Sequence, residues 1–88
     1  MLRLDNYAFN NNQIVLKFGD YDLSIIKDGY GGDRGMYEIG VFKDRNMVEL
    51  PGVTAEGDTV RGFLTESDVD GILLKMYSIT KADPERIR

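Results

Sequence analysis

The chain has 88 residues and a net charge of −4, from 15 acidic and 11 basic residues, and it contains neither cysteine nor histidine. This length predicts one domain with a modest core, and 42% hydrophobic with 30% charged residues is an ordinary balance that excludes disorder. The lack of cysteine excludes disulfides and thiolate metal sites and fits a reducing compartment, so we expect a cytoplasmic protein. We expect no membrane insertion, because the sequence has no signal segment and no apolar run near the ~20 residues that span a bilayer.

The first twelve residues predict either a short edge strand or an ordered arm. Leu2 and Leu4 alternate with charged residues, which is a strand pattern. The asparagines that follow, at positions 6 and 10–12, favour turns.

Two strands joined by a tight turn come next. Apolar side chains recur at every second position over residues 14–18 and again over residues 21–26, as in half-buried strands. The intervening Gly19 and Asp20 suit a two-residue type II′ turn. We therefore predict an antiparallel hairpin here.

A third strand follows a glycine-rich segment. Residues 28–35, DGYGGDRG, separate the second strand from an alternating pattern over residues 35–43, so these two strands form a hairpin with a long tip. A turn then leads to a short strand over residues 47–50. Residues 60–64 are either a last short strand or the approach to a helix.

Residues 65–80 predict an amphipathic helix. Thr65 is placed to cap its start, with Asp68 in the position of the capping-box acid. Glycine inside a helix costs roughly 1 kcal/mol relative to alanine, so at Gly71 either packing tolerates it or another group approaches closely, and we expect packing. One apolar stripe is formed by Val69, Ile72, Leu73, Met76 and Ile79.

These elements predict an α+β fold: a small antiparallel β-meander of four to five strands with one C-terminal amphipathic helix packed on one face. Residues 1–81 form the single domain. Pro84 disfavours the helical conformation at Asp83, so we expect residues 82–88 to be a frayed C-terminal tail.

No motif in the sequence indicates a cofactor, a metal ion or catalysis. The glycine-rich tip misses the phosphate-binding spacing because Arg34 stands where the third glycine belongs, and a strand follows where a helix start is required. The acids that open the helix resemble half a calcium loop, but Tyr77 occupies the position of the bidentate glutamate. Without histidine or cysteine, the common general base and the common strong nucleophile are missing, and we expect no enzymatic activity.

The glycine-rich tip is one candidate for partner binding. Tyr30 lies there beside Asp33 and Arg34, and exposed tyrosine and arginine side chains often anchor interfaces. The alternative is that Tyr30 folds back onto the sheet.

The strands carry apolar residues on both faces, which gives a second candidate. Val15, Ile26 and Phe42 project away from the helix if the set facing it is Leu16, Leu23, Ile39 and Val41. One helix cannot cover both faces. Either this face meets a second chain in a two-fold homodimer, or the N-terminal arm folds over it through Leu2, Leu4, Tyr7 and Phe9.

Two segments, YGGDRGMYEIGVF and VRGFLTESDV, resemble a class of short bacteriophage proteins with a YGG-x-x-G-x-YE-x-x-V hairpin and a V-x-G-[YF]-LT-[ED]-x-DV helix start. The resemblance spans roughly residues 21–80. The matching positions are Tyr30, Gly31, Gly32, Gly35, Tyr37, Glu38, Val41, Val60, Gly62, Phe63, Leu64, Thr65, Asp68 and Val69. The resemblance implies a viral origin and a hairpin-plus-helix domain, and it supplies no active site.

The expected function is that of a phage-encoded accessory protein, non-enzymatic, which binds a host or viral protein in the host cytoplasm. A structural or assembly component of the virion is the main alternative. The third possibility is a nucleic-acid role. Binding of nucleic acid ranks low, because a net charge of −4 with no basic run repels phosphate. Imitation of DNA by the acidic surface ranks equally low.

Overall fold

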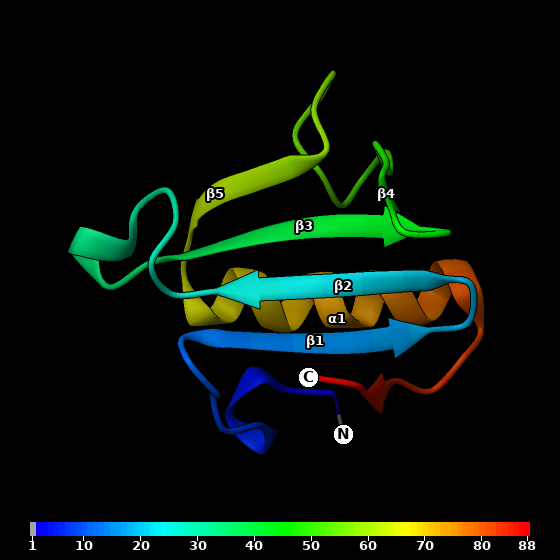
Figure 1. The fold of residues 1–88 in the computed structure, drawn as a ribbon, viewed down its shortest axis with the longest axis horizontal. Coiled ribbons are helices and arrows are strands. Elements are labelled where there is room, and N and C mark those ends of the chain that lie inside the picture. The colour runs from blue at the N-terminus through cyan, green and yellow to red at the C-terminus, as the bar shows by residue number, and fades with distance from the viewer. Residues whose placement is uncertain (1) are drawn as a thin grey trace.

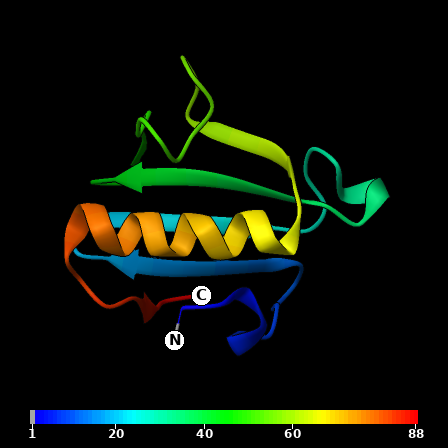
Figure 2. The same cartoon turned by 180° about the vertical axis from the view of Figure 1, so that it is seen from behind.

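The computed structural model describes residues 2–88 and has two layers, an antiparallel sheet and a single helix lying across one of its faces (Figure 1 and Figure 2). The α+β prediction is confirmed, with six strands where four to five were expected. In chain order the elements are η1 (Leu4–Asn6), β1 (Gln13–Phe18), β2 (Tyr21–Ile26), η2 (Gly32–Arg34), β3 (Tyr37–Lys43), β4 (Asn46–Met47), β5 (Val60–Leu64), α1 (Glu66–Thr80) and β6 (Glu85–Arg86).

The central strands β1, β2 and β3 form the predicted meander. Phe18 pairs with Tyr21, which leaves a two-residue turn, and Gly19 has the positive φ of +60° that such a turn requires at its first position. The turn between β3 and β4 places Asp44 and Arg45 at positive φ and returns the chain along β3. The fourth strand was predicted over residues 47–50 but pairs only at Asn46–Met47.

The sheet order is β4-β3-β2-β1-β6, and β5 also pairs with β3. Alternation along the strands turns one face towards α1, so that strand and helix side chains share one core. The buried apolar side chains are Leu4, Ile14, Leu16, Phe18, Leu23, Ile25, Ile39, Val41, Leu50, Val53, Leu64, Val69, Ile72, Leu73 and Met76. The four strand residues expected to face the helix are all among them.

The helix begins as predicted. The backbone N–H of Asp68 donates to the Thr65 hydroxyl at 3.1 Å, and the Thr65 N–H donates to the Asp68 carboxylate at 3.0 Å, which is a reciprocal capping box. Two expectations were wrong. Ile79 is 40% exposed and lies outside the core, and no atom beyond the helix itself lies within 4 Å of a side chain added at Gly71.

The C-terminal tail is paired with the sheet, which corrects the expectation that residues 82–88 fray. Glu85 pairs with Lys17 and Arg86 with Leu16. The backbone N–H of Val15 donates to the Arg88 carbonyl at 2.7 Å. The tail therefore satisfies backbone groups along the edge of β1 that would otherwise be open, and the domain extends past residue 81. Met1 lies outside the described residues.

Candidate functional site

The loop between β2 and β3 is closed by a short helical turn. Gly31 and Gly35 flank η2 with φ of +89° and +72°, and a side chain at either position would be strained. The N–H of Gly32 donates to the Gly29 carbonyl at 2.9 Å. This turn positions Tyr30 and Arg34 on the same end of the sheet.

Tyr30, Arg34 and Phe63 form an exposed aromatic group that we call the tip cluster. The Tyr30 and Phe63 rings stack with centroids 6.5 Å apart and planes 21° apart, and the Arg34 guanidinium lies 5.9 Å from the Phe63 centroid. The rings remain in water, because Tyr30 is 64% and Phe63 54% exposed. The backbone N–H of Phe63 donates to the Tyr30 carbonyl at 3.1 Å, which ties the loop between β2 and β3 to strand β5.

A β-bulge in β5 turns Phe63 outward. Tyr37 pairs with Leu64 and Ile39 with Arg61, so Gly62 and Phe63 together face a single residue of β3. Phe63 has a φ of +56°, in the left-handed region that costs a side-chain-bearing residue about 1–2 kcal/mol. The bulge therefore exposes an aromatic ring at the expense of backbone strain.

The predicted tip residues have different outcomes. Tyr30 does not fold back onto the sheet, and Arg34 lies with it in the tip cluster. Asp33 lies in η2, is exposed, and makes no hydrogen bond or ion pair with any described residue. Phe63 was not among the partner-binding residues predicted from the sequence. Its available signal was Gly62 followed by two apolar residues, which breaks strand alternation and is typical of a bulge.

The second surface is the face of the sheet turned away from α1, which we call the outer face. Val15, Ile26 and Phe42 lie on it as predicted, and each is half-buried. Alternation and register give its members as Gln13, Val15, Lys17, Asp22, Ser24, Ile26, Glu38, Gly40, Phe42, Met47 and Val60. No described segment crosses this face, which is turned towards the viewer in Figure 1.

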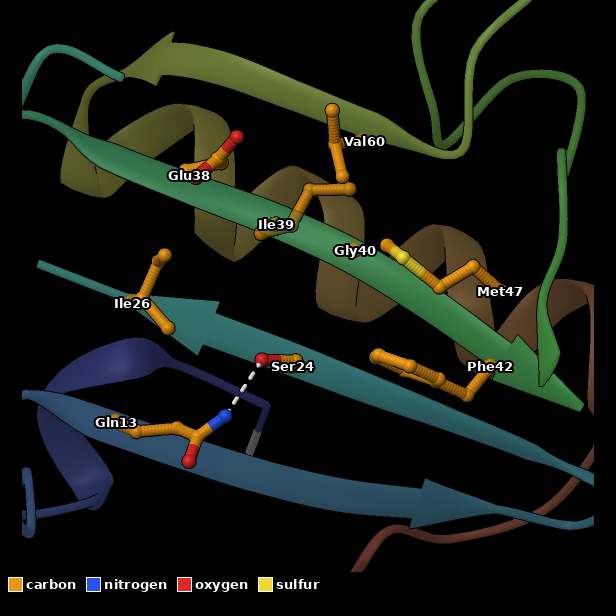
Figure 3. Close-up of a pocket in the computed structure, with 9 residues that line it drawn as sticks. All are labelled: Gln13, Ser24, Ile26, Glu38, Ile39, Gly40, Phe42, Met47 and Val60. Carbon is orange, nitrogen blue, oxygen red and sulfur yellow. Dashed lines mark hydrogen bonds between the residues drawn. The ribbon is translucent and has the colours of Figure 1, made fainter. Parts of the chain in front are cut away.

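The centre of the outer face is hollowed. Val15 pairs with Ser24, Ser24 with Gly40 and Gly40 with Val60, so two small residues lie in the middle of one row. Ile26, Phe42 and Met47 rise beside them around a cavity of about 240 Å³ (Figure 3). The side-chain amide of Gln13 donates to the Ser24 hydroxyl at 3.0 Å and satisfies this polar group.

The N-terminal arm does not cover the outer face, which corrects one of the two alternatives. Leu4 is buried in the core between sheet and helix, and its backbone N–H donates to Asp70 of α1 at 2.7 Å. The Phe9 ring stacks at 5.6 Å on Tyr37, and the Lys27 ammonium lies 4.6 Å from the Phe9 centroid. The arm therefore extends the core on the helix side and leaves the outer face open.

The helix cap shifts the pKa of one carboxyl group, that of Asp68. A hydrogen bond from the Thr65 backbone, followed by one with its side chain, lowers the pKa of Asp68 below its ordinary value. Among residues 2–88 no three acidic side chains are grouped to hold a metal ion, and no helix has the length and hydrophobicity needed to cross a membrane.

Comparison with known proteins adds no relative to this geometry, because no protein-family model, curated protein or solved structure matches the chain.

Proposed function

We propose that the chain is a non-enzymatic, phage-encoded accessory protein that binds a host or viral protein in the host cytoplasm through the tip cluster. The observation that carries this proposal is the Phe63 ring, which is 54% exposed on a backbone with a φ of +56°. The phage origin rests on the resemblance of the YGGDRGMYEIGVF and VRGFLTESDV segments.

The bulge at Phe63 costs more free energy than its contacts inside this chain return. The left-handed backbone at Phe63 costs about 1–2 kcal/mol, while the ring buries only part of its surface against Tyr30. Covering a phenylalanine side chain completely is worth roughly 1.5–3 kcal/mol. A partner that covers both rings would recover this free energy, and strained exposed residues of this kind cluster at binding sites.

The tip cluster also suggests the chemistry of the partner surface. Arg3–Asp5 is the single ion pair among residues 2–88, so the Arg34 guanidinium has its donors free beside the rings. An apolar contact flanked by a carboxylate would match this arrangement, since aromatic and arginine side chains dominate binding hot spots.

The test is an affinity capture with matched variants. Tagged wild type, Phe63→Asn and Leu74→Gln are incubated with lysate of the bacterium in which the phage grows, and retained proteins are quantified by mass spectrometry. Asparagine tolerates a left-handed backbone, so Phe63→Asn removes the ring without adding strain. Leu74 is 57% exposed on the helix, so its variant controls for the loss of an exposed apolar side chain elsewhere.

We expect one protein to be retained by wild type and Leu74→Gln and lost with Phe63→Asn. The purified partner should then bind Phe63→Asn and Arg34→Ala at least ~10-fold more weakly by titration calorimetry, about 1.4 kcal/mol. A retained set that is identical for all three baits contradicts the proposal. Stoichiometric presence in purified virions without such a partner favours the structural or assembly role, and a salt-dependent gel shift with DNA favours the nucleic-acid role.

A further inference from the structure

We propose that the outer face binds the same face of a second copy of this chain, so that two sheets stack as a two-fold homodimer with a helix on each outside. This interface is separate from the tip cluster. The shape, the size and the charge of the outer face support a second copy as its occupant.

The relief of the outer face allows two copies to interlock. The row that holds Ser24 and Gly40 is low, and the neighbouring rows hold Ile26 on one side and Phe42 on the other. These rows lie two residues away along the strands, roughly 7 Å, so ridge and hollow alternate on one surface. A two-fold axis in the interface plane allows the ridge of each copy to enter the hollow of the other.

A second hollow extends the first towards the C-terminal tail. It has a volume of about 280 Å³, shares Ser24 and Phe42 with the first, and is bounded by Ile87 and Arg88. Ile87 is 50% exposed there. The hollowed surface therefore runs from β5 to the segment that follows β6, and its lining is mixed: apolar Val15, Phe42 and Ile87 alternate with polar and charged residues that include Asp22.

The size of this side of the molecule permits a stable dimer. The sheet lies on the broadest side of the molecule, whose principal extents are 32 and 29 Å, so a flat footprint reaches at most about 900 Å². Specific complexes bury about 800 Å² per partner. A dimer of this class through the outer face would therefore have to use most of this side of the molecule.

The charge of the outer face allows two copies to meet. The whole chain carries −4, which makes like surfaces repel. On this face and its tail edge, however, Lys17 and Arg88 balance Asp22 and Glu38. The face is neutral overall, so its apposition adds no net repulsion to that between the remaining surfaces.

Sedimentation over a concentration series from low micromolar to near millimolar tests the dimer. Wild type should shift from 10.0 kDa towards twice that mass. Met47→Glu should remain a monomer, because Met47 is 45% exposed and lies beside the hollow. Leu74→Glu makes the same kind of change on the helix layer and should dimerise like wild type. Phe42→Asp should also abolish the dimer.

Amide chemical shifts give a readout that misfolding does not mimic. On raising the wild-type concentration, shifts should change at Ser24, Ile26 and Gly40 and stay constant along α1 and at Phe63. A wild type that remains at 10.0 kDa at every concentration overturns the proposal and leaves the face to a different protein. So does a dimer that Leu74→Glu disrupts and Met47→Glu preserves. The tip-cluster proposal survives either result, because its variants and its partner are different.

Discussion

The backbone N–H of Leu4 donates a 2.7 Å hydrogen bond to the carboxylate of Asp70, 66 residues later in the chain. This bond fixes the N-terminal arm to the first turns of α1, and it places the Leu4 side chain, only 2% exposed, in the core. The arm is thereby committed to the helix side. This contact and the stacking of Phe9 on Tyr37 keep the arm away from the outer face.

Replacing Asp70 should release the arm. Hydrogen bonds to charged groups contribute about 1.5–3 kcal/mol, so Asp70→Ala should lower the free energy of unfolding by about 2 kcal/mol in urea titrations. Asp70→Asn retains an oxygen acceptor and should lose less. The Leu4 amide should also exchange with solvent faster in Asp70→Ala. Equal losses for both variants, with Leu4 still protected, would contradict this role.

Gly71 offers a stabilising substitution. It is exposed in the interior of α1, and a methyl group added there has open space around it. Alanine is favoured over glycine in helices by about 1 kcal/mol, so Gly71→Ala should raise the free energy of unfolding by up to about that amount. Urea denaturation measures the change.

Gly62 is the contrasting control for this prediction. A Cβ atom at Gly62 would lie 2.5 Å from the Tyr30 Cβ, so Gly62→Ala should destabilise the fold and displace the tip cluster. A stabilised Gly62→Ala, or a destabilised Gly71→Ala, would show that the packing around these two glycines differs from the one described.

The helix cap should make stability depend on acid. The pKa of Asp68 is lower in the folded chain than in the unfolded one, because of its hydrogen bonds with Thr65. Its contribution is present above the unfolded pKa of about 4 and is lost as the pH falls through the folded pKa. In Asp68→Asn the loss of stability that comes from protonating Asp68 should be absent. Glu66 makes no hydrogen bond to Thr65, so Glu66→Gln should retain this loss. Thermal unfolding between pH 2 and pH 7, roughly the range over which carboxyl groups titrate, decides between these outcomes.

The features that the sequence predicted correctly depend on local spacing. Thr65 and Asp68 are three residues apart, and the two-residue turn at Gly19 follows from the alternation on either side of it, so short-range pattern was sufficient. The outer-face positions of Val15, Ile26 and Phe42 follow from the same two-residue period.

The features that the sequence did not predict depend on contacts between distant segments. The pairing of Arg86 with Leu16 and the bond between Leu4 and Asp70 each join opposite ends of the chain, and no local pattern specifies such a partner. For the same reason, two of the three residues of the tip cluster were predicted. Tyr30 and Arg34 are near in sequence, whereas Phe63 reaches them only through the register shift of β5 against β3.

Residue 63 should invert the usual order of alanine and glycine. Both Phe63→Ala and Phe63→Gly remove the ring and its contacts with Tyr30 and Arg34, so these losses cancel in the comparison. At a φ of +56° alanine is strained by about 1–2 kcal/mol and glycine is not. We therefore expect Phe63→Gly to be more stable than Phe63→Ala by about 1 kcal/mol in urea denaturation.

Arg61 provides the matched reference for this inversion. It is exposed in the same strand and does not have a positive φ. Arg61→Ala should therefore be more stable than Arg61→Gly by about 0.5–1 kcal/mol. The inversion at residue 63 alone would show that the fold maintains a strained backbone at the point where it exposes an aromatic ring. If alanine is the more stable residue at both positions, the bulge relaxes to an ordinary extended backbone. The Phe63 ring is then not held against Tyr30, and backbone strain no longer supports the tip cluster as a binding site.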